Sequence, residues 1–275
     1  MNELTGPVFV DLEWLEARTA VLVHVGTTMG GDDPVAAFEA RHLAGAHFVS
    51  LDDDLADPPD GVRGRHPLPT PERFAGVLDR IGIDDHSLVV AYDDRGGAFA
   101  ARLVWMLRIL DVDARLLDIA PASIPAGSGS ASNRAHVVPP DSGHQRAVRP
   151  WPASALASAD EVAAHIDGGG VVIDSREAPR YRGEVEPIDP VAGHVPGAIN
   201  RFFGDNLADG ALRPTDELRD RFSVVAGDSD AIVYCGSGVT ACHNALAIEQ
   251  AGLGRPRIYV GSWSGWSADP ARPIA

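Results

Sequence analysis

Lysine does not occur anywhere in the 275 residues, and cysteine occurs only twice, as Cys235 and Cys242. Without lysine the chain has no amine for a Schiff base and no lysine for a phosphate-binding loop, which excludes pyridoxal enzymes and Walker-type NTPases. Two thiols are too few for a disulfide framework or a four-thiolate metal site. The sequence therefore predicts no metal and no cofactor, and leaves nucleophilic or redox chemistry for the cysteines.

The sequence also lacks long apolar runs and any excess of positive charge. No uninterrupted apolar segment reaches the roughly 20 residues that cross a bilayer, and the first seven residues show no basic region followed by an apolar stretch. We therefore expect a cytoplasmic protein with no membrane partner. The formal net charge of -16 would repel nucleic acid and anionic lipid, so we expect neither as a partner.

The two halves of the sequence share one pattern. Apolar, β-branched runs alternate with helical periodicity, which is typical of parallel sheets flanked by helices. The predicted strands are residues 21–25, 87–92, 171–174 and 231–234. The predicted helices are residues 71–81, 98–110, 158–166 and 240–251, with Gly252 as the last C-cap. A duplication is indicated by three pairs that recur in order at nearly equal spacing: Val23 and Ile173, His42 and His194, Tyr92 and Tyr234.

This pattern predicts an α/β protein with two tandem domains, each a parallel sheet flanked by helices. The N-terminal domain covers residues 1–126 and the C-terminal domain covers residues 153–275. Residues 127–152 are rich in glycine, serine and proline, which is the composition of a linker.

Cys235 lies where an apolar strand pattern ends and a helical pattern is about to begin. Unpaired amides of the first helical turn and the helix dipole would stabilise a thiolate there, and any anion attached to it. Gly236 and Gly238 allow the loop to curve and expose its amides. We predict Cys235 as a nucleophile, held by an anion loop made of Gly236, Ser237, Gly238, Val239 and Thr240. Cys242 is expected in the core, and His243 on a helix surface.

Four motifs of the second half stand in a fixed order: Val-Ile-Asp-Ser-Arg at 172–176, Gly-His-Val-Pro-Gly-Ala-Ile-Asn at 193–200, Cys-Gly-Ser-Gly-Val-Thr-Ala at 235–241 and Tyr-Val-Gly-Ser-Trp-Ser-Gly-Trp at 259–266. With the duplication, they resemble the tandem-domain rhodanese family of thiosulfate and 3-mercaptopyruvate sulfurtransferases. The resemblance implies two rhodanese-like domains and a persulfide on Cys235. Sulfur would pass from 3-mercaptopyruvate or thiosulfate to a thiol or cyanide acceptor, with no metal.

In that family only the C-terminal domain keeps the cysteine. The first-half counterpart of Tyr234-Cys235-Gly236 is Tyr92-Asp93-Asp94, and an aspartate cannot carry sulfane sulfur. We therefore expect the N-terminal domain to be catalytically inactive.

Several charged residues take roles from the resemblance. Arg180 matches the arginine that binds the donor, although an ion pair with Glu177 or Glu184 would also explain it. Arg182 is a second candidate for donor binding. Asp174 and Arg176 are expected to brace the loop, and Glu186 either borders the cleft or is solvated.

The sequence leaves the sulfur donor open between thiosulfate and 3-mercaptopyruvate. Thiosulfate-preferring relatives place cations just after the cysteine, whereas this chain has Gly236 and Ser237, as in the mercaptopyruvate branch. In that branch the serine joins a histidine and an aspartate, for which His42 and Asp33 are the candidates here, unless His42 only packs its turn. Mercaptopyruvate enzymes also carry a second arginine at the position of Asp189, where this acid would repel a donor unless Arg41 or Arg182 compensates.

Two other functions compete with sulfur transfer by an enzyme. Rhodanese-like phosphatases need an arginine where this chain has Ala241, which argues strongly against phosphate chemistry. A non-catalytic sulfur carrier or protein-binding module is the more serious alternative. Its partner would contact Trp263, Trp266 or the segment 201–203, although core packing also explains these aromatic residues.

Overall fold

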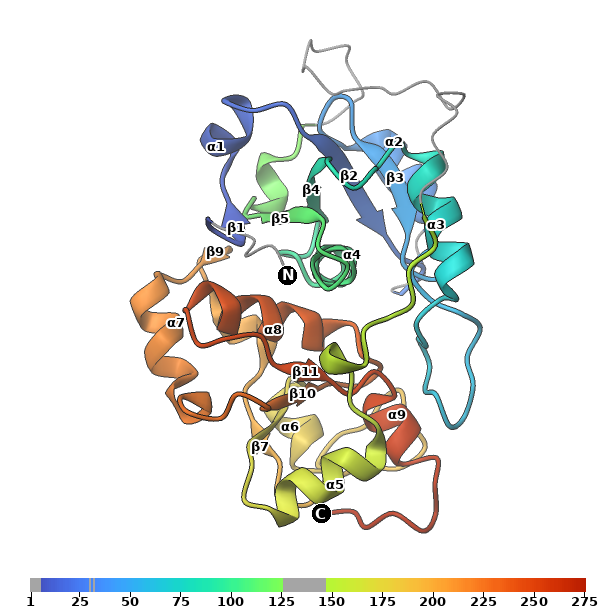
Figure 1. Cartoon of the computed structure of the whole chain (residues 1–275), viewed down its shortest axis with the longest axis vertical. Coiled ribbons are helices and arrows are strands. Elements are labelled where there is room, and N and C mark those ends of the chain that lie inside the picture. Colours follow the sequence, from blue (N-terminus) through green and yellow to red (C-terminus); the bar gives the residue numbers. More distant parts are fainter. Residues whose placement is uncertain (1–5, 30, 32, 126–146) are drawn as a thin grey trace. The chain divides into compact units, whose positions relative to one another are not determined.

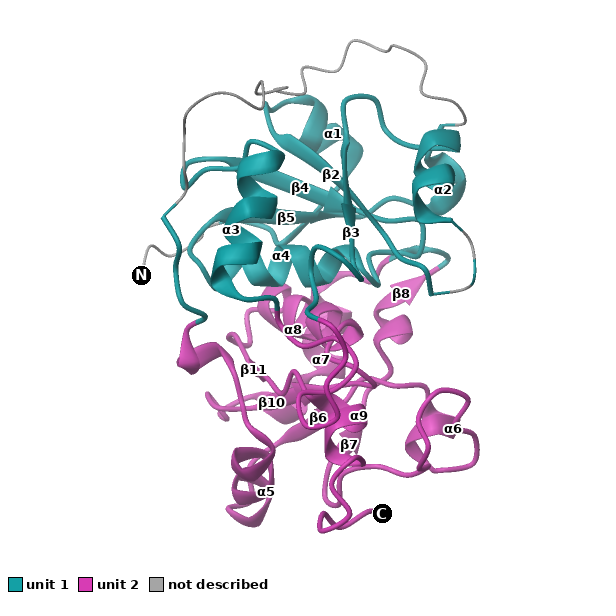
Figure 2. Ribbon diagram, turned by 90° about the vertical axis from the view of Figure 1, so that its right-hand side faces the viewer, with its two compact units in different colours: residues 1–57, 69–151, 209–211 teal, residues 58–68, 152–208, 212–275 magenta. Residues whose placement is uncertain are grey.

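The computed structural model describes residues 6–29, 31, 33–125 and 147–275, and it divides into two compact units. Unit 1 consists of residues 1–57, 69–151 and 209–211, and unit 2 of residues 58–68, 152–208 and 212–275 (Figure 2). Residues 58–68, which the sequence placed in the N-terminal domain, therefore belong to unit 2. Of the expected linker at 127–152, only residues 147–152 are described.

Unit 1 is built on a parallel sheet in the strand order β1-β5-β4-β2-β3 (Figure 1). The strands are β1 (Phe9–Val10), β2 (Val21–Gly26), β3 (His47–Ser50), β4 (Leu88–Tyr92) and β5 (Asp113–Leu117). The helices are α1 (Leu12–Glu16), α2 (Pro34–Ala40), α3 (Pro71–Arg80) and α4 (Ala100–Arg108). Every residue of helix α4 is buried, and the helix packs on β2, β4 and β5.

Unit 2 is built on a parallel sheet in the order β11-β10-β6-β7. Its strands are β6 (Val172–Asp174), β7 (Ile199–Asn200), β10 (Ile232–Tyr234) and β11 (Arg257–Ile258), and β8 (Leu207–Ala208) pairs with β9 (Ala211–Leu212). The helices are α5 (Ala159–Asp167), α6 (Ala178–Tyr181), α7 (Thr215–Arg221), α8 (Thr240–Gln250) and α9 (Ser262–Trp266). Helix α8 packs on β10 and β11, so the residues between β10 and α8 form a short loop at the carboxyl end of the sheet.

The two sheets repeat one topology. The order β3-β2-β4-β5 in unit 1 matches the order β7-β6-β10-β11 in unit 2. A buried tyrosine contact repeats as well: the Tyr92 hydroxyl accepts the amide N–H of Leu43 at 2.7 Å, and the Tyr234 hydroxyl accepts that of Val195 at 3.1 Å. The predicted α/β class with parallel sheets is confirmed, and the four predicted helices differ from the observed ones only at their ends.

Helix starts follow local capping chemistry. Asp33 caps α2 by accepting the amides of Val35 and Ala36, and Ser158 forms a reciprocal capping box with Glu161 at the start of α5. Among the described residues, none of the helices combines the length and the apolar character needed to cross a bilayer.

His24 makes the stability of unit 1 depend on pH. Its ring is buried on β2 against Phe38, Phe48 and Tyr92, and its Nδ1 has no hydrogen-bond partner among the described residues. Burial lowers the pKa of His24 from 6.5 to about 4. Between these values the unfolded chain takes up a proton that the folded chain refuses, so acidification favours unfolding.

We expect this group to remove about 3 kcal/mol of unfolding free energy as the pH falls from 6.5 to about 4. Urea unfolding at several pH values should show a flatter slope for His24→Phe than for the unaltered protein across that range. Equal slopes in the two proteins would contradict the assignment.

Candidate active site

Cys235 directly follows β10 and begins the loop that leads into α8. The residue is buried, with 1% of its surface exposed, and its Sγ accepts the amide N–H of Gly238 at 3.1 Å. Gly238 has φ +77, and a Cβ at this position would lie 2.5 Å from the carbonyl oxygen of Val260. Only glycine fits there, so the turn that brings this amide to the sulfur depends on Gly238.

The segment around α9 is hydrogen-bonded to the cysteine loop. The amides of Trp263 and Ser264 donate to the carbonyls of Cys235 and Gly236, each at 2.9 Å. The Cys235 amide donates to Ser262 Oγ at 3.1 Å, and Ser262 adopts φ +53, a conformation that costs a non-glycine residue free energy. Ser262 lies in the motif at 259–266, but no sequence pattern indicates this contact.

The equivalent loop of unit 1 shows how many amides such a turn can direct at one anion. Asp93 follows Tyr92 as Cys235 follows Tyr234. The Asp93 carboxylate accepts four amide N–H groups at 2.7–2.8 Å, from Arg95, Gly97, Phe99 and Ala100. Burial raises the pKa of Asp93, and these four hydrogen bonds oppose that rise. A carboxylate therefore fills, in unit 1, the loop that carries the thiol in unit 2.

Two guanidinium groups lie beside Gly236, the residue that follows Cys235. A Cβ placed on Gly236 would be 3.0 Å from Nη2 of Arg65 and 3.5 Å from both Nη atoms of Arg180. Arg180 comes from α6 and is the residue for which the resemblance implies donor binding. Arg65 comes from the segment 58–68, where its amide donates to Ser264 Oγ at 3.1 Å. Any anion that approaches the loop at Gly236 therefore meets both positive charges.

Arg180 pairs with Glu186 and Asp189, not with Glu177 or Glu184. Glu186 Oε1 lies 2.7 Å and Asp189 Oδ2 3.3 Å from Arg180 Nη2. Burial raises the pKa of Glu186, but hydrogen bonds from Arg180 and from two amides bring it below its usual range. Burial raises the pKa of Asp189, which the charge of Arg65 only partly opposes.

Arg176 and Asp174 form a fully buried ion pair next to this cluster. Arg176 Nη2 donates to Asp174 Oδ2 and to the Gly193 carbonyl, both at 2.7 Å, and its guanidinium lies 4.8 Å from the ring centre of Trp263. Burial by itself would lower the pKa of Arg176, but Asp174 and Glu186 raise it. The pair ties the end of β6 to the loop before β7.

His66 is the histidine bonded to Ser237. Its Nδ1 lies 2.8 Å from Ser237 Oγ. The sequence offered His42 for this position, with Asp33 beside it. The structure instead gives Asp33 as the cap of α2, and bonds His42 Nδ1 to the Phe38 carbonyl. The signal that was missed is the run Arg63-Gly64-Arg65-His66 inside a proline-rich and glycine-rich segment, where a packing role for basic side chains is least expected.

His42 has a packing role that its counterpart repeats. Its ring stacks on Phe38 at 4.2 Å, and its Nδ1 bonds to the Phe38 carbonyl. His194 stacks on Tyr181 at 3.9 Å and bonds to the Tyr181 carbonyl in the same way. Because the same contact occurs in both halves, it belongs to the duplicated fold and accounts for the repeat of the motif.

The two arginines named to compensate for Asp189 have other partners in the structure. Arg182 is half exposed and pairs with Glu184 through two hydrogen bonds at 2.7 and 2.8 Å. Arg41 donates to the carbonyls of Pro121 and Ile124 in unit 1. The cations that meet Asp189 are Arg65, in an ion pair with Oδ1, and Arg180, at Oδ2.

The remaining candidates are core residues. Cys242 is fully buried, as predicted, and its thiol donates to the Gly238 carbonyl at 3.4 Å. Trp263 and Trp266 are buried, which confirms core packing. His243 was expected on a helix surface but is fully buried, because α8 packs against the segment that holds Phe203 and Asn206.

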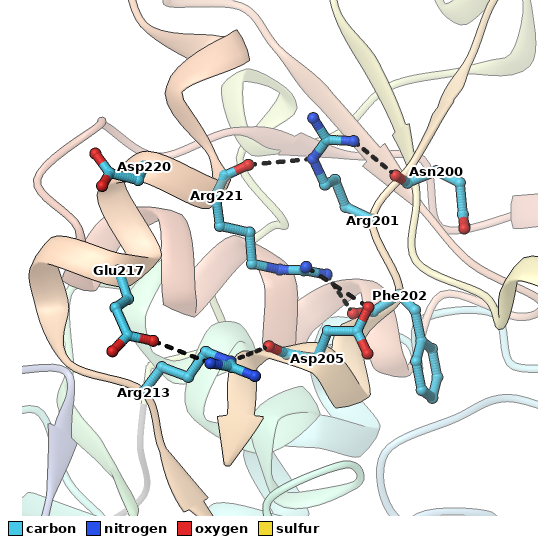
Figure 3. Close-up of a pocket in the computed structure, with 8 residues that line it drawn as sticks. All are labelled: Asn200, Arg201, Phe202, Asp205, Arg213, Glu217, Asp220 and Arg221. Atoms are coloured by element: carbon cyan, nitrogen blue, oxygen red, sulfur yellow. Dashed lines mark hydrogen bonds and ion pairs between the residues drawn. The ribbon is translucent and has the colours of Figure 1, made fainter.

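The segment 201–203 borders a polar pocket of about 750 Å³ beside α7 (Figure 3). The pocket is lined by Asn200, Arg201, Phe202, Asp205, Arg213, Glu217, Asp220 and Arg221. Arg201 donates to the carbonyls of Asn200 and Arg221, and Arg213 pairs with Glu217. The segment is half-buried rather than exposed: Arg201 belongs to this local network, and the rings of Phe202 and Phe203 contact each other.

Comparison with known proteins agrees with this geometry. The family model for the rhodanese-like domain matches residues 158–269. A Pseudomonas aeruginosa protein with the provisional name 3-mercaptopyruvate sulfurtransferase is 44% identical over 251 residues, covering 86% of this chain and 85% of that protein. A Mycobacterium tuberculosis protein with the provisional name thiosulfate sulfurtransferase SseB is 38% identical, covering 94% and 98%.

A solved structure is similar over nearly the whole chain. The crystal structure of SseA from Escherichia coli, described as a 3-mercaptopyruvate enzyme with the rhodanese fold, matches with a TM-score of 0.73 and 27% identity. The match covers 94% of this chain and 99% of SseA. The chain belongs to the tandem-domain rhodanese family of sulfurtransferases.

Proposed function

We propose that this chain transfers sulfane sulfur from 3-mercaptopyruvate to a thiol or cyanide acceptor through a persulfide on Cys235. The observation that carries the proposal is the position of Cys235: its sulfur meets the Gly238 amide, and the Arg65 and Arg180 guanidiniums lie at the next residue. A nucleophilic sulfur, an amide donor and paired cations are what an anionic sulfur donor requires. Gly236 and Ser237 carry no charge of their own, which favours the carboxylate donor over thiosulfate.

The chemistry balances without a cofactor. The Cys235 thiolate attacks the thiol sulfur of the donor, so that an S–S bond forms and the donor's C–S bond breaks. The electron pair passes to the donor carbon, and the resulting enolate takes the proton of the donor thiol and leaves as pyruvate. An acceptor thiolate or cyanide then attacks the outer sulfur of the persulfide and restores the Cys235 thiolate.

Ser237 and His66 are placed to handle that proton. Their 2.8 Å hydrogen bond joins a hydroxyl in the cysteine loop to an imidazole in the same unit. A hydroxyl oriented by a histidine can pass a proton to a developing enolate. The amides of Gly236, Ser237, Val239 and Thr240 stay predicted donors to the outer sulfur of the persulfide, by analogy with the four amides around Asp93.

A comparison of two donors tests the proposal. With cyanide as acceptor, we expect repeated turnover of 3-mercaptopyruvate to pyruvate, and a kcat/KM for thiosulfate at least about tenfold lower, or 1.4 kcal/mol in transition-state binding. Comparable values for the two donors would contradict the donor assignment. Persulfide formation without turnover of either donor would identify a sulfur carrier instead. A cytoplasmic location stays a prediction.

A further inference from the structure

The cluster beside Cys235 holds a carboxylate where the anionic group of a donor would bind. Arg65 and Arg180 both lie at Gly236, and Asp189 pairs with both through its two oxygens. Two guanidinium groups that converge on one point can bind the planar carboxylate of a ligand. Here the carboxylate between the two guanidiniums belongs to the protein itself: it is that of Asp189, whose side chain is only 3% exposed.

Arg65 and Arg180 are the accessible arginines of the cluster. Their side chains are 26% and 15% exposed, whereas that of Arg176 is 1% exposed. Arg176 is also committed to Asp174 and the Gly193 carbonyl. A donor that reaches the sulfur past Gly236 therefore exchanges hydrogen bonds with Arg65 and Arg180.

The cluster is charge-balanced before a donor enters. Its three cations, Arg65, Arg176 and Arg180, face its three acids, Asp174, Glu186 and Asp189. A donor adds negative charge to this neutral group, at the side of Asp189. The resulting repulsion grows in proportion to the charge of the donor.

On the basis of the proposed function, we propose that Arg65 and Asp189 set the donor selectivity of this site. Arg65 is the second guanidinium, beside Arg180, for the anionic group of the donor. Asp189 disfavours doubly charged thiosulfate more than a singly charged α-keto carboxylate, because each unit of donor charge adds the same repulsion. Arg65 attracts the donor and Asp189 repels it, so the two members of this ion pair have opposite effects on donor binding.

Substitution from each end of the ion pair tests this inference. We expect Asp189→Asn to raise kcat/KM about tenfold for 3-mercaptopyruvate and about a hundredfold for thiosulfate, through KM more than kcat. Arg65→Gln should lower both values, and that for thiosulfate more. The thiosulfate-to-mercaptopyruvate ratio thus moves in opposite directions. Asp216→Asn on α7 makes the same change in net charge outside the cluster, and should leave the ratio unchanged.

Arg65→Lys separates charge from geometry. Lysine keeps the charge but loses the planar fork, so kcat/KM for 3-mercaptopyruvate should fall while the ratio between donors stays. A ratio that moves in the same direction in Asp189→Asn and Arg65→Gln would reduce the pair to a structural brace and overturn the inference. So would an Arg65→Lys ratio equal to that of Arg65→Gln. Failure of the proposed function is distinct, since the unaltered protein would then turn over neither donor, and the inference would fall with it.

Discussion

Cys235→Ser should lower sulfur transfer by about a thousandfold or more, equivalent to about 4 kcal/mol of transition-state stabilisation. A serine hydroxyl is not ionised near neutral pH and cannot hold sulfane sulfur, so the first half-reaction has no nucleophile. The fold should survive, with a change in unfolding free energy within about 1 kcal/mol, because Gly238 can donate to Oγ as it does to Sγ. Mass spectrometry after donor addition measures the persulfide directly.

Cys242→Ser is the matched control, since it changes the chain's other thiol. Cys242 is buried in α8 and donates to the Gly238 carbonyl, a hydrogen bond that serine can keep. The persulfide should form in Cys242→Ser and not in Cys235→Ser. A persulfide on Cys235→Ser, or its loss in a folded Cys242→Ser protein, would disprove the assignment of the nucleophile.

The sheets and the cysteine could be predicted because local sequence controls them. β-Branched runs at 21–25 and 171–174 become β2 and β6, and the helical pattern after Gly238 becomes α8 with an end only one residue from the prediction. Cys235 is recognisable for the same reason: a strand, two glycines and a helix in succession determine the turn whatever surrounds it.

Two residues beside the cysteine loop, Arg65 and His66, could not be predicted, because they come from a distant part of the chain. Arg65 and His66 lie in an irregular segment that joins unit 2 and reaches Asp189 and Ser237 across more than a hundred residues. No periodicity marks such a segment, and loops take their path from packing. The motif at His42 is repeated at His194, and both histidines make the same packing contact. A repeated motif of this kind indicates a residue required by the fold of both units, whereas a catalytic residue is required in one unit.

Arg176→Met should lower the free energy of unfolding by about 3–5 kcal/mol, measured by urea denaturation. The side chains of Arg176 and Asp174 are 1% and 0% exposed, so loss of the guanidinium leaves the Asp174 carboxylate buried with no counter-charge at 2.7 Å. The Gly193 carbonyl loses its donor as well. The loss of stability comes from the unpaired charge of the Asp174 carboxylate. Asp174→Asn combined with Arg176→Met should therefore recover a large part of the lost unfolding free energy.

Arg182→Met provides the comparison, since Arg182 holds Glu184 through two hydrogen bonds as short as those of the buried pair. That pair is half exposed on both sides, and water already solvates each charge. We therefore expect Arg182→Met to leave the urea midpoint nearly unchanged. Equal losses in the two arginine variants would mean that burial does not set the value of these ion pairs. A large loss of unfolding free energy in Arg176→Met alone would show that the buried ion pair stabilises the end of β6, and that removing one partner leaves the other charge buried without a counter-charge.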